Sequence, residues 1–230
     1  MTRREAIAAN LARVRQRVAE ACAAAGRDPA EVTIVAVTKT FPAADVRLLA
    51  DLGVLDVGEN RDQEAAPKAH ELADLPLRWH FVGQLQTNKC RSVAGYAHLV
   101  HSVDRPRLVA SLSAAVSAGH RLGCLVQVAL DDDPDRGGAR AADVPSLADA
   151  VAAAPGLELR GVMAVAPLGA DPRRAFARLA EVASGVRRQH PGAAIVSAGM
   201  SGDLEAAIAA GATHVRVGTA LLGDRGRQVR

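Results

Sequence analysis

Short apolar runs alternate with helix-like stretches along almost the whole chain, and this alternation constrains the fold more than any other feature. Eight runs resemble strands, at residues 32–39, 54–58, 79–83, 98–103, 123–130, 157–165, 194–197 and 213–217. Several of them are nearly continuous in apolar residues, which is typical of parallel strands buried on both faces. Eight strand–helix units in 230 residues predict an α/β fold, a (β/α)8 barrel of the TIM type.

Helical stretches fill most of the intervals between these runs, and we expect helices near 42–52, 61–73, 105–118, 144–153, 172–189 and 204–210. An extra N-terminal helix precedes the first strand, because Ile7, Leu11, Val14 and Val18 form one apolar stripe. No linker or shift in composition divides the chain, so the sequence predicts a single barrel domain over residues 1–230. An open doubly wound sheet is the alternative fold, but no glycine-rich dinucleotide fingerprint follows the first strand.

Composition excludes several classes of function. Aromatic residues make up only 2% of the chain and the net charge is +3, which argues against a nucleic-acid-binding surface with stacking side chains. No apolar run reaches the roughly 18–20 residues of a membrane span, and the charged start MTRREAI lacks the apolar core of a signal peptide. Cys22, Cys90 and Cys124 follow no metal-ligand spacing and are expected to be buried free thiols. We therefore expect a cytoplasmic protein with no metal site.

The end of the first strand carries a candidate nucleophile. In such a barrel the functional face lies at the carboxyl ends of the strands, and strand alternation points Lys39 into the barrel mouth. A lysine amine near apolar walls is able to attack a carbonyl group. Only three of the 28 basic residues are lysines, namely Lys39, Lys68 and Lys89. The alternative interpretation of Lys39 is a rim lysine that pairs with an acid such as Glu59.

Two glycine-containing turns follow the seventh and eighth strands, which is the usual location of a phosphate site in this fold. Ser201 lies in the first turn, and Gly218 and Thr219 form the second. Each turn offers a hydroxyl group and backbone amides to an anion. Ordinary turn and helix-capping chemistry is the alternative explanation for each turn taken alone.

A lysine nucleophile and a phosphate site in one barrel mouth together suggest pyridoxal 5'-phosphate. Arg216, two residues before Gly218, then becomes informative. A guanidinium beside the pyridine nitrogen would keep that nitrogen unprotonated and weaken the ring as an electron sink. A structural ion pair inside the barrel is the alternative role of Arg216.

Six segments carry a resemblance to a known family: VAVTKTFP (35–42), GENRDQE (58–64), WHFVGQLQTNK (79–89), HSVDR (101–105), LRGVMAV (159–165) and SAGMSGDLEAAIAAGATHVRVGTALLG (197–223). In this order they resemble the pyridoxal phosphate homeostasis protein family, whose members are single-domain barrels similar to the N-terminal domain of alanine racemase. The resemblance implies that Lys39 carries the cofactor as an aldimine and that Arg216 approaches the pyridine nitrogen. It further implies a phosphate site at Ser201, Gly218 and Thr219, and a ring site near Asn60 and Met200.

The resemblance also implies a role without established turnover. Family members bind, store and deliver pyridoxal phosphate and take part in vitamin B6 and amino-acid homeostasis, with cofactor-dependent apoenzymes as recipients. Alanine racemase needs a second, β-rich domain with a catalytic tyrosine, whereas the only tyrosine here, Tyr96, precedes the fourth strand. We expect a monomer, since no partner is needed to complete the mouth. A minimal racemase or another Schiff-base-lysine enzyme is the alternative, and a phosphate-binding barrel in which Lys39 only forms an ion pair is a third.

The chain departs from its relatives in the loop after the fifth strand. Many relatives have a Lys-x-Gly segment where this chain reads Asp135-Arg136-Gly137-Gly138. Arginine keeps the positive charge but does not readily form an imine, so a transient lysine attachment site is not expected in this loop. The carboxylates of Asp131–Asp133 in the same loop lack the spacing of a metal-binding loop.

Overall fold

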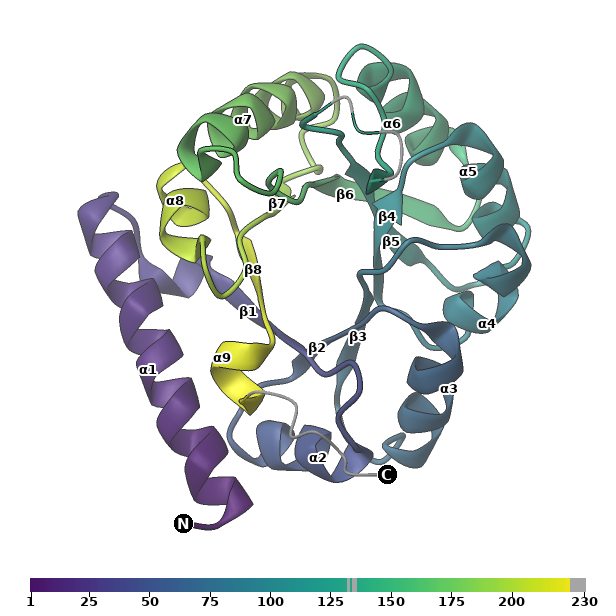
Figure 1. Ribbon diagram of the computed structural model, residues 1–230. Coiled ribbons are helices and arrows are strands. Elements are labelled where there is room, and N and C mark those ends of the chain that lie inside the picture. The colour runs from purple at the N-terminus through teal and green to yellow at the C-terminus, as the bar shows by residue number, and fades with distance from the viewer. Residues whose placement is uncertain (132, 134–135, 224–230) are drawn as a thin grey trace.

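A closed barrel of eight parallel strands forms the centre of the protein. The computed structural model describes residues 1–131, 133 and 136–223. The strands follow one another around the barrel in chain order, as the view down its axis shows (Figure 1). They are β1 (Thr33–Val37), β2 (Asp56–Glu59), β3 (Arg78–Phe81), β4 (Leu99–Val103), β5 (Leu122–Gln127), β6 (Leu157–Met163), β7 (Ile195–Ser197) and β8 (His214–Val217). The predicted α/β barrel is confirmed.

The pairing of β1 with β8 closes the barrel. Val35 of β1 lies opposite Arg216 of β8, and on its other side β1 pairs with β2 through Ala36 and Val57. Because every pair is parallel, all eight carboxyl ends open on the same face. The turns that follow β7, β8, β1 and β2 therefore meet at one rim.

Helices surround the barrel. They are α1 (Arg3–Ala24), α2 (Ala43–Asp51), α3 (Asp62–Glu71), α4 (Cys90–Ala94), α5 (Pro106–Ser113), α6 (Val144–Ala153), α7 (Pro172–Gln189), α8 (Leu204–Ala209) and α9 (Thr219–Leu222). The short helix α4 and the 3₁₀ turns Pro29–Glu31 and Thr87–Lys89 are not predicted by the sequence pattern. These elements are three to five residues long, too short to show a helical period in the sequence.

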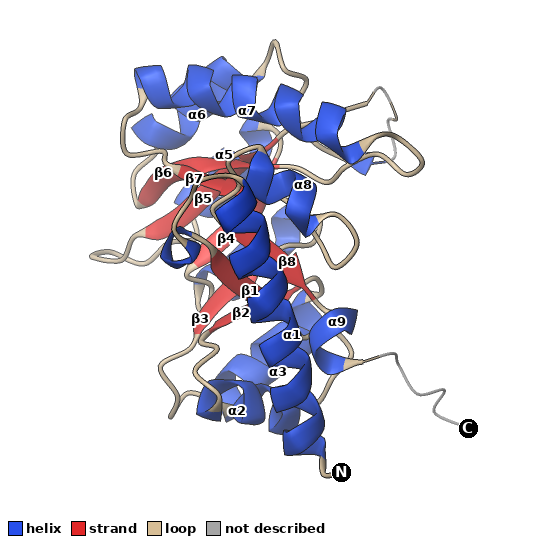
Figure 2. Ribbon diagram, turned by 90° about the vertical axis from the view of Figure 1, so that its left-hand side faces the viewer, coloured by secondary structure: helices blue, strands red, loops and turns tan. Residues whose placement is uncertain are grey.

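The extra N-terminal helix α1 covers the junction between β8 and β1. It begins with a capping box, in which Thr2 accepts a hydrogen bond from the Glu5 amide and the Glu5 carboxylate accepts one from the Thr2 amide. Its predicted apolar stripe is buried against residues of α8 and α9. Figure 2 shows α1 crossing the outside of the barrel beside both helices. The first helix of the chain thus packs on the last two.

The main apolar core lies between the strands and the outer helices, and it includes the large side chains of Leu108, Phe176 and Leu179. The barrel interior holds a much smaller apolar cluster around Leu99, Leu125 and Met163. All three cysteines are buried free thiols, as expected. In the part of the chain that the structure describes, no helix is both long and apolar enough to cross a membrane.

Candidate functional site

The residues predicted for the site gather at the carboxyl ends of neighbouring strands. They are Lys39 after β1, Asn60 after β2, Met200 and Ser201 after β7, Arg216 within β8, and Gly218 and Thr219 after β8. Close packing brings these ends together: a Cβ added at Gly218 would lie 3.3 Å from the carbonyl oxygen of Val37 in β1. The turns after β7 and β8 also touch, because the Thr219 hydroxyl donates to the Ser201 hydroxyl at 3.5 Å.

Lys39 is a half-buried side chain without a polar partner. No described residue forms an ion pair or hydrogen bond with its amine. The alternative in which Glu59 pairs with Lys39 is wrong, because Glu59 accepts from Lys68 Nζ at 2.7 Å. The inward residues of β2 include Asp56, whereas Glu59 lies in the opposite alternation and turns toward α3. The Lys39 amine therefore remains available at the mouth.

The two turns after β7 and β8 offer free hydrogen-bond donors. None of the described residues accepts a hydrogen bond from the backbone amides of Ser201, Gly202 or Thr219. The neighbouring Met200 amide is taken, since it donates to Asp203 Oδ1 at 2.6 Å. Arg17 of α1 steadies the first turn by donating to the Ser201 carbonyl at 2.9 Å. Unengaged amides beside hydroxyl groups are the donors that a phosphate group requires.

Asn60 and Met200 flank the same mouth. Asn60 is half-buried, and the segment after β3 packs tightly against it: a Cβ added at Gly83 would come within 2.2 Å of the Asn60 carbonyl oxygen. Asn60 also lines a groove of about 420 Å³ together with Phe81 and Gln84. The Met200 side chain is 41% exposed and leaves an apolar surface at the rim.

Arg216 is buried in the barrel and held by oxygen atoms from two neighbouring strands. Its Nη1 donates to the carbonyl and hydroxyl oxygens of Ser197 at 2.9 and 2.7 Å, and its Nη2 donates to the Ala164 carbonyl at 2.9 Å. The alternative of a structural ion pair is not supported, since no carboxylate among the described residues lies within ion-pair distance of Arg216. Burial lowers the pKa of Arg216 to about 10. The guanidinium is still cationic at neutral pH.

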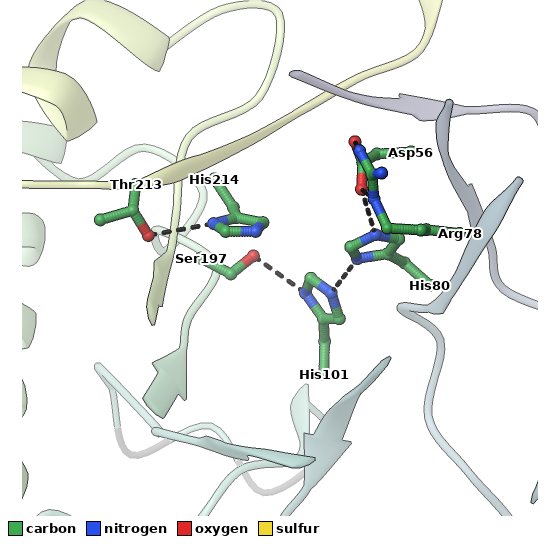
Figure 3. A network of polar contacts seen from close by, with 7 residues as sticks. All are labelled: Asp56, Arg78, His80, His101, Ser197, Thr213 and His214. Carbon is green, nitrogen blue, oxygen red and sulfur yellow. Dashed lines mark hydrogen bonds and ion pairs between the residues drawn. The ribbon is translucent and has the colours of Figure 1, made fainter. Parts of the chain in front are cut away.

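Ser197 connects Arg216 to a line of polar side chains through the barrel, which sequence reasoning missed (Figure 3). Ser197 Oγ lies 2.9 Å from His101 Nδ1, His101 Nε2 lies 2.8 Å from His80 Nδ1, and His80 Nε2 lies 3.0 Å from Asp56 Oδ1. Because Arg216 donates to Ser197, the serine proton is free for His101. His101 then donates from Nε2 to His80 Nδ1, and His80 donates from Nε2 to Asp56 Oδ1. Both ring nitrogens of His80 thus have partners inside the barrel.

Burial and hydrogen bonding set the charges of His101 and Asp56 in this line. Burial, with the nearby His80 and Arg216, holds the pKa of His101 well below its usual range. Burial opposes ionisation of Asp56, but hydrogen bonds from His80 and Arg78 outweigh it and hold the pKa of Asp56 well below its usual range. The Arg78 guanidinium donates to Asp56 Oδ1 at 2.7 Å. The charge of Asp56 is thus compensated at the barrel end opposite the mouth.

Two further sequence expectations concern the surroundings of the mouth. Tyr96 packs edge-on against Trp79 with ring centroids 6.4 Å apart, in the apolar layer outside the barrel strands. Arg136 donates to the Ala166 carbonyl at 2.8 Å. Asp132, Pro134 and Asp135 of the same loop lie outside the described residues. Within the described ranges, no group of three histidine, cysteine or acidic residues is arranged to hold a metal ion.

Comparisons with known proteins find relatives that match nearly the whole chain. The family model of the alanine racemase N-terminal domain matches residues 3–226. The pyridoxal phosphate homeostasis protein of Pseudomonas aeruginosa is 48% identical over 223 residues, which cover 95% of this chain and 96% of that protein.

Solved structures of other proteins resemble the fold of this chain. PipY of Synechococcus elongatus, solved with PLP bound, superposes with a TM-score of 0.82 at 35% identity and covers 94% of this chain and 100% of its own. Alanine racemase from Corynebacterium glutamicum gives a TM-score of 0.69 at 17% identity, with 95% of this chain matching 60% of that one, which is a likeness of fold alone. Because the match to the Pseudomonas aeruginosa protein spans nearly the full length of both chains, this chain belongs to the pyridoxal phosphate homeostasis protein family.

Proposed function

We propose that this protein binds pyridoxal 5'-phosphate at the barrel mouth, as a monomer, and carries and buffers the cofactor without turnover of its own. Its role would lie in vitamin B6 and amino-acid homeostasis, with cofactor-dependent apoenzymes as recipients. One observation carries the proposal: an unpartnered lysine amine adjoins two turns that offer unengaged backbone amides and a pair of hydroxyl groups, at the ends of β1, β7 and β8. The PLP that is bound to PipY, a relative of similar length, supports it.

The residues at the mouth fit the chemical groups of the cofactor. Ser201, Gly218 and Thr219 would hold the phosphate through backbone amides that no described residue engages and through the two adjoining hydroxyl groups. The Lys39 amine would bond to the aldehyde carbon, and the aldehyde oxygen would leave as water. Asn60 and Met200 would flank the ring. When bound, the cofactor supplies a reactive aldehyde and an electron-withdrawing ring.

Arg216 favours storage of the cofactor over turnover. A cationic guanidinium next to the pyridine nitrogen disfavours protonation of that nitrogen, so the ring withdraws electrons less strongly. The three oxygen acceptors from Ser197 and Ala164 leave Arg216 few alternative positions. The absence of a tyrosine at the mouth, with Tyr96 packed on Trp79, agrees with a carrier rather than a racemase.

The visible absorption spectrum with and without added pyridoxal phosphate tests this proposal. We expect a new band that borohydride reduction abolishes, with one equivalent of reduced cofactor attached to Lys39 in peptide mass spectra. The Lys39→Ala variant should show no such band, and Lys89→Ala should behave like the wild-type protein. A wild-type protein with no band in excess cofactor would refute cofactor binding. Amino-acid racemisation or decarboxylation at an enzyme-like rate, lost in Lys39→Ala, would refute the carrier role.

A further inference from the structure

Lys39 is the second residue of a tight turn whose conformation is strained. The Phe41 amide donates to the Thr38 carbonyl at 3.1 Å and closes a four-residue turn, Thr38–Phe41. The third residue, Thr40, has a φ of +69° and is the only described residue other than glycine with a positive φ. This turn position normally selects glycine, and a β-branched side chain there is a true outlier. Surrounding contacts must therefore hold the turn in place.

Three charged side chains provide these contacts. On the near side of Lys39, Lys68 Nζ donates to the Thr38 carbonyl at 2.9 Å, while the Thr38 hydroxyl donates to Glu59 Oε1 at 2.7 Å. On the far side, the Thr40 amide donates to Glu64 Oε2 at 3.0 Å. Glu64 and Lys68 are one helical turn apart on α3. The backbone is thus fixed immediately before and after Lys39.

The ion pair between Lys68 and Glu59 is buried. Glu59 is 0% exposed and the Lys68 side chain is 12% exposed. Its second carboxylate oxygen, Glu59 Oε2, has no hydrogen-bond partner among the described residues. A buried ion pair of this kind is weak evidence for a stabilising role, because desolvation offsets much of the attraction. The role of the Lys68–Glu59 ion pair is better explained by the position that it imposes on Thr38.

The presence of a lysine at position 68, where an arginine would be more usual in this chain, agrees with a role in positioning Thr38. The chain uses arginine for all but three of its 28 basic residues. Lys68 places one compact ammonium between a carbonyl and a carboxylate oxygen, 2.9 and 2.7 Å away. The planar fork of arginine does not offer this tetrahedral arrangement of donors. Lys68 is thereby bound to the turn that carries Lys39.

We propose that Glu59, Glu64 and Lys68 are positioning residues for the Lys39 amine. They hold the turn, including its strained third residue, so that the amine faces the mouth before the aldehyde arrives. This inference rests on the proposed function, since it assigns these residues to the covalent step and not to binding of the phosphate or the ring. A purely structural role would instead affect all ligand binding and the fold together.

Two ligands separate these roles. Pyridoxal 5'-phosphate has the aldehyde, whereas pyridoxine 5'-phosphate has an alcohol in its place and binds only through phosphate and ring. In Glu64→Ala we expect the rate of borohydride-trappable adduct formation to fall about tenfold, since loss of orientation slows bond formation. The dissociation constant for pyridoxine 5'-phosphate should stay within about twofold of wild type, because no phosphate or ring contact is changed. Glu71→Ala, at the exposed end of α3, is the matched control and should change neither value.

A second substitution tests the role of strain. Glycine adopts a positive φ without steric cost, so Thr40→Gly added to Glu64→Ala should restore most of the lost rate. For the buried pair, the double variant Lys68→Met with Glu59→Gln avoids leaving a lone charge in the interior and should also form the adduct slowly. Lys89→Met is the control for loss of a lysine.

Several results would overturn the proposal. One is a wild-type rate of adduct formation in Glu64→Ala. Another is an equal loss, in that variant, of the rate of adduct formation and of the affinity for pyridoxine 5'-phosphate. The third is an adduct-formation rate that does not recover when Thr40→Gly is added. If the wild-type protein itself forms no adduct, the proposed function fails, and the contact is still tested without cofactor. Amide hydrogen exchange at Thr40 should then be at least about tenfold faster in Glu64→Ala than in wild type, because a bonded amide is protected. Equal exchange rates would contradict the positioning contact itself.

Discussion

Removal of the Lys68 ammonium alone should destabilise the protein far more than removal of the Lys89 ammonium. In Lys68→Met the Glu59 carboxylate stays fully buried and loses its cation at 2.7 Å, while its Oε2 atom already has no described partner. Breaking a buried ion pair from one side costs about 3–5 kcal/mol of unfolding free energy. For a chain of this size each kcal/mol lowers the melting temperature by about 2–4 °C. The expected loss is therefore on the order of 6–20 °C.

The matched comparison is Lys89→Met. Lys89 Nζ lies 3.9 Å from Asp62 and its side chain is one third exposed, so its pair contributes about 1 kcal/mol or less. Adding Glu59→Gln to Lys68→Met should recover most of the lost stability, because no uncompensated charge remains in the interior. Thermal melts followed by circular dichroism measure all four proteins. Equal losses in Lys68→Met and Lys89→Met, or no recovery in the double variant, would refute the reasoning.

Three further predictions concern the barrel interior and its closure. Burial keeps His101 and His214 neutral in the folded protein, with the pKa of His214 lowered to about 4, so the unfolded chain binds protons more readily. The free energy of unfolding should therefore fall as pH drops from about 6.5 to about 4. Urea denaturation across this range measures it. A free energy of unfolding that does not change would show that these two histidines are not kept neutral by the fold. Arg216→Glu should shift the absorption maximum of bound pyridoxal phosphate by favouring the protonated pyridine, and an unchanged spectrum with retained binding would place Arg216 away from the ring. We also expect residues 1–230 to unfold as one unit, since α1 packs on α8 and α9; circular dichroism and Trp79 fluorescence should give coincident transitions, whereas separate transitions would show independent parts.

Much of the fold could be predicted from the sequence because each strand is a short apolar run bounded by turn residues. The apolar stripe of Ile7 to Val18 likewise fixed the face of α1 that is buried. The short helix α4 was missed because its two buried residues, Cys90 and Val93, do not establish a period. The pattern of apolar residues thus predicts an element that spans several periods of that pattern, and it does not predict a shorter one.

The site was predictable only at the level of strand ends. The barrel rule placed Lys39, Ser201 and Thr219 on one face, since parallel strands share their carboxyl edge. The hydrogen bonds of Arg216 to Ser197 were not predictable, because they depend on side chains of neighbouring strands and on burial. The alternative that paired Lys39 with Glu59 could have been rejected from the sequence, because strand alternation already separates Glu59 from the inward residues of β2. The rarity of lysine was the one signal that pointed to Lys68.

The distribution of lysine has a consequence for selectivity toward aldehydes. Pyridoxal phosphate condenses with accessible primary amines in general, whereas guanidinium groups do not readily form imines. Of the three lysine amines in this chain, Lys68 is committed to two oxygen atoms inside the protein and Lys89 lies near Asp62. An aldehyde that diffuses over this arginine-rich surface therefore encounters few competing amines. The surface chemistry thus leaves few lysine amines to compete with Lys39 for the aldehyde in the proposed function.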